Sequence, residues 1–332
     1  MKKLAVVLLL ILVLVTAVSC TPHVESMESM IGTLISLNIT GVDAKRAETD
    51  IYAMIVEVDK SVSTNRTDSL VARINNAGVG EIIALDYITN DMIAVSSDYY
   101  ERTGGAFDIS IFPLVDVWQF SPNKLSHDSK APPTDEAIAD AMARVGLDKV
   151  FDYNRDERTI TKRIEGAMLD LGAIAKGYIA DRARMILDNY TIDKAIIDIG
   201  RTLYLYGDKT YNVGISHPRP GIGNDIIEVI ECRDTSVSTS GDYERYYLDS
   251  NTGERYHHII DPATGRPARS GLVSVTIVGE SAMLSDILST AVFVLGEERG
   301  KALLSTIPEV ESAVFVSDNG GKLEVTHYAK VG

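Results

Sequence analysis

The second half of the chain, from Lys149 onward, alternates many short strand-like runs with few helical ones. Runs of apolar and β-branched residues predict strands near 158–162, 194–199, 210–216, 226–231, 272–278, 312–317 and 322–326. Periodic apolar stretches predict helices near 173–189, 281–295 and 297–306. These helices are too few for a regular parallel sheet, in which each strand pair needs a crossover helix. The pattern therefore predicts an α+β fold, with mixed or antiparallel sheets and packed helices.

The first half begins with one strand-like run, Met30 to Thr40, in which apolar positions alternate. Helices are predicted near 43–62, 68–76 and 91–102. The last of these ends at Thr103-Gly104-Gly105, where glycine can adopt the left-handed conformation that ends many helices. The polar, proline-bearing segment 121–133 indicates a surface excursion rather than a domain linker.

The N-terminus has the three parts of a secretory signal: Lys2 and Lys3, an apolar run over residues 4–15, and small residues before Cys20. The run is too short to span a bilayer comfortably. The residues at 17–20 resemble a bacterial lipobox, so we expect cleavage before Cys20 and acylation of its thiol and new amino group. An ordinary cleaved signal with a cysteine there by chance is the alternative.

These features predict a signal peptide (1–19), a lipidated tether (20–29) and a folded part (30–332), either one large domain or a core with a smaller subdomain. We expect the mature protein outside the cytoplasm, lipid-anchored to a bacterial membrane, on the periplasmic side of the inner membrane. Only Cys232 remains beside Cys20, which excludes an intramolecular disulfide framework.

The net charge of -15 argues against nucleic acid as a partner, because phosphate contacts need clustered Lys and Arg. An acidic protein that handles phosphate groups needs a metal ion to offset the repulsion. The sequence has no P-loop, dinucleotide-binding, nucleophile-elbow or H-E-x-x-H motif. Its few histidines and cysteines disfavour zinc. The expected metal is therefore magnesium or calcium, bound through oxygen.

Two segments combine charged or polar side chains with a helix. In 169–178, Asp170 and a glycine lead into a helix with Lys176 in its first turn, which suits an anion. A strand-to-helix corner, with Asp170 accepting from backbone amides, is an equally good explanation. In 281–296, Asp286 and Thr290 lie on one helix face and offer two oxygen ligands for magnesium. Most such pairs merely face water or bond to the backbone.

Two further segments combine glycine, aromatic and titratable residues. Paired glycines, an aromatic and an acid over 103–108 allow close approach of a ligand, but a helix cap beside a packed aromatic explains them too. In 256–265, His257 and His258 point to opposite faces of a strand, so they do not readily bind one metal together. One of them can act as a general base, with a core histidine as the alternative.

Taken in order, these segments resemble the ApbE family of FAD:protein FMN transferases over nearly the whole mature chain. The matching runs are 30–33, 59–75, TGGAFD from Thr103, LDLGAIAKGYIADRA from Leu169, STSGDYERYY from Ser238, HHIIDPATGRP from His257 and ESAMLSDILSTAVFVLG from Glu280. The resemblance implies an ApbE-like fold and an exported enzyme that splits FAD. It would transfer FMN, through a phosphoester bond, to a threonine or serine hydroxyl of a redox protein and release AMP.

The resemblance also implies roles for individual residues. Magnesium would lie against the Ala173 carbonyl, the Asp286 carboxylate and the Thr290 hydroxyl. Contacts to the flavin dinucleotide would come from Met30, Asn65, Ala106, Phe107, Asp108, Asp170, Lys176 and the backbone near Ile260. His258 would take the proton from the acceptor hydroxyl. The implied partners are FAD and exported domains of membrane redox complexes.

Two positions depart from the family pattern. Asn65 stands where the family usually has an aromatic, so a stacking surface is lost and space opens for water. Arg201 stands in a run where the family usually has Gly-Gly-Asn, and it adds a charged side chain to a tight backbone position. These departures keep two alternatives open: hydrolysis of FAD to FMN and AMP, and a flavin-binding lipoprotein without turnover.

Overall fold

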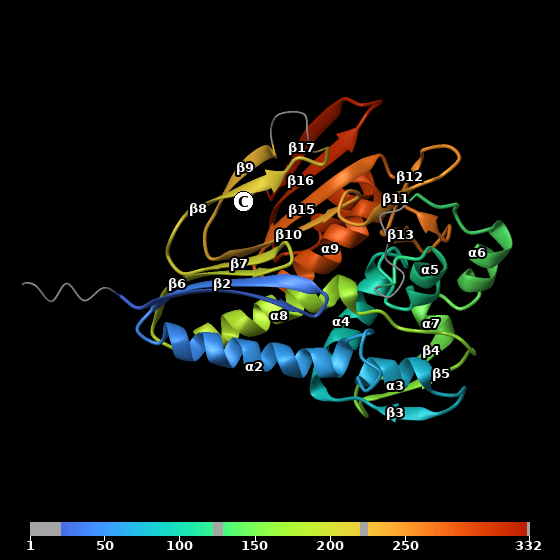
Figure 1. Ribbon diagram of the computed structural model, residues 1–332, viewed down its shortest axis with the longest axis horizontal. Helices are drawn as coiled ribbons and strands as arrows, with labels where there is room; N and C mark the ends of the chain where they lie inside the picture. Colours follow the sequence, from blue (N-terminus) through green and yellow to red (C-terminus); the bar gives the residue numbers. More distant parts are fainter. Residues whose placement is uncertain (1–20, 122–128, 220–224, 331–332) are drawn as a thin grey trace, which may run out of the picture.

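A central antiparallel sheet organises the molecule (Figure 1). The computed structural model describes residues 21–121, 129–219 and 225–330. Within these residues the sheet has the order β1-β2-β6-β7-β10-β15-β16-β17, and every neighbouring pair is antiparallel. The strands are β1 His23–Met30, β2 Thr33–Gly41, β6 Ile192–Ile199, β7 Thr202–Tyr206, β10 Thr235–Gly241, β15 Leu272–Gly279, β16 Val310–Asp318 and β17 Leu323–Ala329. The predicted α+β class is confirmed.

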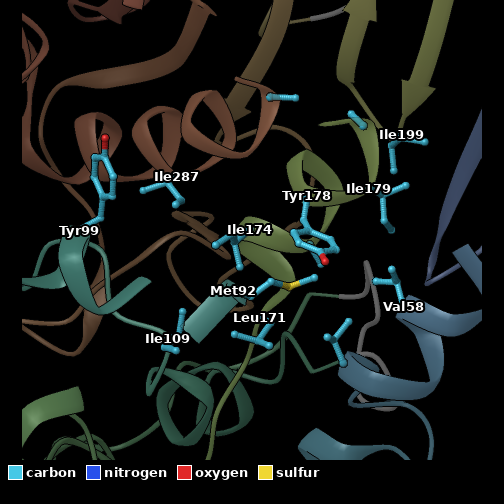
Figure 2. Close-up of a cluster of buried hydrophobic side chains, with 14 of the residues drawn as sticks. Val58, Met92, Tyr99, Ile109, Leu171, Ile174, Tyr178, Ile179, Ile199 and Ile287 are labelled. Atoms are coloured by element: carbon cyan, nitrogen blue, oxygen red, sulfur yellow. The ribbon is translucent and has the colours of Figure 1, made fainter. Parts of the chain in front are cut away.

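Two helices, α8 (Gly172–Leu187) and α9 (Ala282–Leu295), contact each other and the sheet strands behind them. In Figure 1, α2 (Ala44–Val62) and α4 (Tyr87–Arg102) lie on the other side of α8, and both contact it. Figure 2 shows apolar side chains from these layers turned toward one another. The labelled members are Val58, Met92, Tyr99, Ile109, Leu171, Ile174, Tyr178, Ile179, Ile199 and Ile287, all part of the main core. This core fixes the position of α8 and α9.

A small hairpin, β8 (Tyr211–Ser216) with β9 (Ile226–Cys232), packs against the sheet through a separate apolar cluster. Cys232 and Val237 are buried in that cluster. The central strand β15 is buried at every position, as expected for a strand covered on both faces.

The remaining elements are short and lie around the helical layers. They are α3 Leu70–Asn76, β3 Ile82–Ala84, α5 Phe112–Val117, α6 Asp135–Met142, α7 Leu147–Val150, β4 Phe151–Asn154, β5 Thr159–Lys162, β11 Tyr246–Leu248, β12 Arg255–His257, β13 Ile260–Asp261, β14 Arg266–Pro267 and α10 Glu297–Leu304. Around α5, Trp118 and Tyr247 anchor a second apolar cluster, and the Trp118 indole donates to the Gly265 carbonyl at 2.7 Å. This cluster supports the segment that carries His258.

The expected tether over residues 20–29 is wrong for most of its length, because His23–Met30 forms β1 and pairs with β2. β1 is an edge strand with largely exposed residues, so its side chains are mostly polar and lack the apolar alternation by which a strand is predicted from sequence. The strand predicted at 30–40 corresponds to β2, which begins three residues after the predicted start, at Thr33.

The signal peptide and the lipidation site at Cys20 lie outside the described residues. Residues 122–128 of the predicted surface excursion also lie outside them. Among the helices that are described, none combines the length and the apolar character needed to cross a bilayer.

Candidate functional site

The helices α8 and α9 approach each other closely at Gly177. A Cβ added to Gly177 would lie 2.3 Å from the Ala282 carbonyl oxygen, so only glycine permits this approach. Asp181, one turn further along α8, accepts from the backbone amides of Ala282 and Met283 at 2.7 and 3.0 Å and from the Ser281 hydroxyl. These bonds satisfy the free amides at the start of α9. They fix α9 against α8.

The carboxylate of Asp286 is the centre of the polar contacts between these helices. It is buried, and its Oδ1 and Oδ2 lie 2.7 and 3.0 Å from the Nζ of Lys176. Oδ2 also accepts from the Gly177 amide at 3.1 Å. On the sheet side, the hydroxyls of Thr202 and Ser238 donate to Oδ1 at 3.3 and 3.2 Å. The partners of this buried carboxylate come from three elements, α8, β7 and β10, which together fix its position on α9.

The next hydroxyl on the same face of β10, that of Ser240, lies 3.2 Å from the Thr290 hydroxyl. Since Ser238 meets Asp286 and Ser240 meets Thr290, the two α9 side chains face β10 together. The prediction that Asp286 and Thr290 share one helix face is confirmed. They do not face bulk water, because Asp286 is buried and Thr290 is only partly exposed.

These oxygens fit a hard divalent cation. Ala173 lies in the first turn of α8, four residues before Gly177, whose amide donates to Asp286 Oδ2. A carbonyl oxygen has two lone pairs and a helix bond uses one of them, so the Ala173 carbonyl can still accept a ligand. A carbonyl, a carboxylate and a hydroxyl are oxygen ligands of the kind magnesium takes, with water or phosphate completing the shell. Among the described residues, no cluster of three or more His, Cys, Asp or Glu side chains offers a different metal site.

The segment before α8 is held by buried polar contacts. The Asn75 side chain pairs with both backbone groups of Leu169, at 2.7 and 2.9 Å, and the Asp170 amide donates to the Ile109 carbonyl. Asp170 Oδ1 accepts from the Gly172 amide at 2.8 Å, as the corner explanation predicts. Burial raises the pKa of Asp170, against the opposing effect of that amide and of the positive charges of Arg245 and Lys176.

For the glycine segment at 103–108, the helix-cap explanation accounts for some residues but not for all of them. Gly104 and Gly105 have φ of 62° and 83° and end α4, as predicted. The Phe107 ring is buried in the main core, so it offers no stacking face. Asp108 is also buried, burial raises its pKa, and its Oδ2 has no hydrogen-bond partner among the described residues. Helix capping and packing explain the aromatic, but they leave Asp108 with an unused acceptor. Ala106 between them is partly exposed.

The two histidines lie in different surroundings, as the strand alternation predicts. His257 is buried, its Nε2 lies 3.0 Å from the Ala268 carbonyl, and burial lowers its pKa to about 4. His258 is partly exposed, and its Nδ1 lies 3.2 Å from the Arg245 carbonyl. Because a carbonyl only accepts, Nδ1 carries the proton and Nε2 carries the lone pair. His257 is a core histidine, whereas His258 keeps an Nε2 lone pair that can accept a hydrogen bond or a proton.

Although part of its surface is exposed, the His258 imidazole is desolvated by the surrounding protein, and this effect, followed by the positive charge of Arg245, lowers the pKa of His258 to about 3. Lys176 is a smaller contributor to the same shift. The Lys176 charge also acts on Asp170 and on Glu244. The structure therefore brings Lys176, Asp286, Asp170 and His258 into one electrostatic neighbourhood, although they come from three separate segments of the sequence.

Two hairpin turns meet beside this site. Met30 pairs with Thr33 around a turn in which Ile31 and Gly32 have positive φ, and a Cβ on Gly200 would lie 2.0 Å from the Thr33 hydroxyl oxygen. The exposed Asn65 has its amide nitrogen 3.7 Å from the position of a Cβ on Gly32. Asn65 and Arg201 thus adjoin the same pair of turns.

One predicted site residue, Ile260, can contribute only its backbone. Four polar side chains around Asp286 and Lys176 had no predicted role. Ile260 is buried in β13, so only its backbone is available to a ligand. Thr202, Ser238, Ser240 and Glu244 were not assigned roles. The family run from Ser238 contained three of them and was the available signal.

Two cavities lie away from this polar network. One of about 450 Å³ is lined by residues of the α8 C-terminus and adjoining turns, including Arg184 and Arg233. The other, of about 350 Å³, borders Asp261 and Arg269. Neither is lined by a predicted site residue. Buried charges with convergent partners locate chemistry better than volume alone, so the Asp286 network is the candidate site.

The chain is similar to known proteins over most of its length. The model of the ApbE family matches residues 31–315. A FAD:protein FMN transferase of Treponema pallidum (strain Nichols) is 32% identical over 314 residues, covering 88% of this chain and 84% of the relative. One from Vibrio cholerae serotype O1 is 32% identical over 283 residues, covering 84% of this chain and 82% of the relative.

Solved structures of flavin transferases are also similar. The flavin transferase ApbE from Vibrio cholerae superposes with a TM-score of 0.81 at 29% identity, over 93% of this chain and 97% of the other. The apo flavinyl transferase ApbE of Pseudomonas stutzeri gives 0.79 at 27% identity, over 92% and 95%. The resemblance inferred from the sequence runs is therefore confirmed, and this chain belongs to the ApbE family.

Proposed function

We propose that this protein is a magnesium-dependent FAD:protein FMN transferase, which moves FMN from FAD to a threonine or serine hydroxyl of an exported redox protein and releases AMP. The observation that carries the proposal is the meeting of Lys176 and Asp286 between α8 and α9, in a neighbourhood that also contains His258. The names of the relatives support the same activity.

The proposed reaction breaks the anhydride bond of FAD and forms a phosphoester. The acceptor hydroxyl oxygen attacks the FMN phosphorus, its proton goes to Nε2 of His258, and AMP leaves with the bridging oxygen. His258 is neutral at physiological pH, so its lone pair is available to the proton. Lys176 provides a positive charge for the phosphate oxygens.

Magnesium, held by the Ala173 carbonyl, Asp286 and Thr290, would supply Lewis-acid charge to the phosphate oxygens. The local hydrogen bonds support this donor set, since β10 hydroxyls orient both α9 side chains. The net charge of -15 also favours a metal as the source of phosphate affinity.

The anchor is part of the same proposal. Lipidation of Cys20 would hold the protein at the outer side of the cytoplasmic membrane, beside redox complexes whose exported domains carry covalent flavin. Tethering raises the effective concentration of enzyme at such acceptors. Since β1 begins at His23, only two residues separate Cys20 from the sheet, and the folded part would lie close to the membrane.

One reaction tests the proposal against its alternatives. Purified protein is incubated with FAD, magnesium and a threonine-bearing acceptor, and both the acceptor mass and the nucleotide products are measured. We expect the acceptor to gain the mass of FMN while AMP appears in equal amount. AMP without modified acceptor would identify a hydrolase, and bound FAD without AMP would identify a flavin-binding protein without turnover.

Hydrolysis is the second candidate, and Asn65 is the observation that favours it. The Asn65 side chain is exposed beside the Met30–Thr33 turn, where the family usually has an aromatic. A short amide covers less surface than a ring and leaves room for water near the dinucleotide. In that case the same chemistry would deliver water instead of the acceptor hydroxyl to the FMN phosphorus.

A further inference from the structure

Arg201 has a backbone conformation that an arginine rarely adopts. It occupies the two-residue turn between β6 and β7, where Gly200 and Arg201 have φ of 53° and 74°. Positive φ at both central residues is the pattern of a type I′ hairpin turn, which favours glycine or asparagine. An arginine in this conformation is strained, and strained residues recur at active sites and ligand-binding segments.

The strained turn holds the Arg201 side chain at the edge of the candidate site. Its amide donates to Asp198 Oδ1, and Nη1 donates to the Ser216 hydroxyl at 3.2 Å. The next residue, Thr202, donates to Asp286. The guanidinium lies over the Tyr243 ring, yet the side chain remains half exposed. Within the described residues, Nη2 meets no acceptor, so donors remain for a ligand.

Glu244 does not account for these donors. Its Oε1 lies 3.7 Å from Arg201 Nε, too far for a hydrogen bond, and this buried oxygen has no hydrogen-bond partner in the described part of the chain. By contrast, Arg219 binds Asp242 through two bonds of 2.7 and 2.9 Å. An arginine that served only to neutralise Glu244 would form the same kind of paired hydrogen bond with it.

The positive charges at the site are able to bind an anionic ligand. Asp170, Glu244 and Asp286 place three carboxylates around Lys176 and Arg245, which are two cations. Arg201 adds a third cation, whose charge also acts on Glu244. A dinucleotide brings two more negative charges, so an added guanidinium that reaches the site offsets part of the repulsion. Its planar pair of donors matches a phosphate group better than an ammonium does.

We infer that Arg201 is a phosphate-binding residue of this chain, which donates to a phosphate oxygen of FAD while Glu244 keeps its guanidinium beside the site. This inference rests on the proposed function for the identity of the dinucleotide. The strained turn then holds the guanidinium at the site, and the long Arg201–Glu244 distance leaves its donors available to a phosphate group.

Equilibrium dialysis with FAD and with riboflavin tests the inference, because riboflavin has the ring but no phosphate. The proteins are the unaltered chain, Arg201→Gly, Arg201→Lys and the control Arg233→Gly. Arg233 pairs with Asp208 near the opposite end of β7, so the control removes the same charge elsewhere. Chromatography confirms that the FAD stays intact, and urea unfolding confirms that each variant is folded.

For Arg201→Gly we expect the Kd for FAD to rise about tenfold, the effect of one lost hydrogen bond to a charged group, while the Kd for riboflavin is unchanged. Arg201→Lys should show a smaller rise, and Arg233→Gly none. The unfolding midpoint of Arg201→Gly should not fall, since glycine relieves the strain. Unchanged FAD binding in Arg201→Gly, or an equal loss for riboflavin, would overturn the inference. Because binding needs no turnover, failure of the transferase proposal gives a different result: FAD bound as expected, without product.

Discussion

The ammonium group of Lys176 lies 2.7 Å from Oδ1 and 3.0 Å from Oδ2 of Asp286, across the contact between α8 and α9. The two residues are 110 positions apart in the sequence. A metal at Asp286 would share this carboxylate with Lys176, and the lysine would then be directed toward the phosphate oxygens. We therefore expect substitutions that change the charge of this pair to have the largest effect on AMP release.

Asp286→Asn should abolish metal-dependent AMP release. The amide keeps the shape of the carboxylate but removes the charge that holds a divalent cation, so we expect a loss of roughly a hundredfold or more. The variant should also lose about 1–3 kcal/mol of unfolding free energy, because Lys176 loses its charged partner. Nucleotide chromatography and urea unfolding measure the two effects.

Asp188→Asn is the matched control for this change. Asp188 follows α8 and forms a half-exposed pair with Arg184. Such surface pairs contribute little, so both activity and stability should stay near those of the unaltered protein. Retention of magnesium-dependent AMP release by Asp286→Asn would rule out Asp286 as a metal ligand.

Gly177→Ala should move α9 away from α8. The added methyl would lie 2.3 Å from the Ala282 carbonyl oxygen and 2.6 Å from the Met283 Cα, both backbone atoms that cannot turn aside. Overpacking of this kind costs about 1–3 kcal/mol. Gly78→Ala is the control, since the nearest atom to its Cβ is 4.0 Å away and a small stabilisation is expected.

Urea unfolding of the two glycine variants gives the comparison. If Gly177→Ala were as stable as Gly78→Ala, the close helix contact would not constrain the site. We also expect Gly177→Ala to lower AMP release, because Asp286 and Thr290 move with α9.

Much of the fold was predictable because its strands and helices carry clear apolar patterns. The helices near 173–189 and 281–295 were placed within two residues at their starts and ends. In contrast, β10 has the sequence Thr-Ser-Val-Ser-Thr-Ser-Gly and escaped prediction. Its hydroxyls are buried against α9, where they bond to Ser285 and Thr290, so they replace the apolar side chains of an ordinary core strand.

The site was predictable only in part, for a related reason. Helical spacing places Asp286 and Thr290 on one face without any tertiary information. The contact of Gly177 with Ala282 depends on packing between distant segments, and no local pattern encodes it. The positions of Lys176, Glu244 and Arg201 relative to one another likewise follow from the tertiary fold.

Acid should destabilise the protein partly through its two adjacent histidines. The pKa values of His257 and His258, about 4 and about 3, lie below the 6.5 of an unfolded histidine. The unfolded chain therefore binds protons first, so this contribution to stability is complete above pH 6.5 and is lost as pH falls toward the folded values. At pH 5 the loss is up to about 2 kcal/mol for each histidine.

His258→Gln isolates one of these contributions. Burial raises the pKa of Asp170 and Glu244, and these groups change stability in the opposite sense as pH falls. The measured quantity is therefore the difference between the unaltered protein and His258→Gln in urea unfolding at pH 7 and pH 5. We expect the variant to lose less stability over this range. An equal loss in both proteins would show that His258 is not held neutral.

Asn65→Tyr should shift the reaction away from water. The exposed Asn65 amide nitrogen lies 3.7 Å from the position of a Cβ on Gly32, so a ring placed there would cover the turn that follows Met30. A ring adds apolar surface for stacking and excludes water from the dinucleotide. We expect AMP release without an acceptor to fall by roughly three- to tenfold, the effect of a stacking contact.

Asn212→Tyr, on an exposed position of β8, is the control for adding the same ring elsewhere. Both variants are assayed with and without a threonine-bearing acceptor, and AMP is compared with acceptor-bound FMN. If Asn65 admits water, Asn65→Tyr lowers only the AMP that is not matched by modified acceptor, while Asn212→Tyr leaves the ratio unchanged. A proportional fall in both products would instead mean that the ring obstructs FAD itself, and the access of water would then depend on another part of the site.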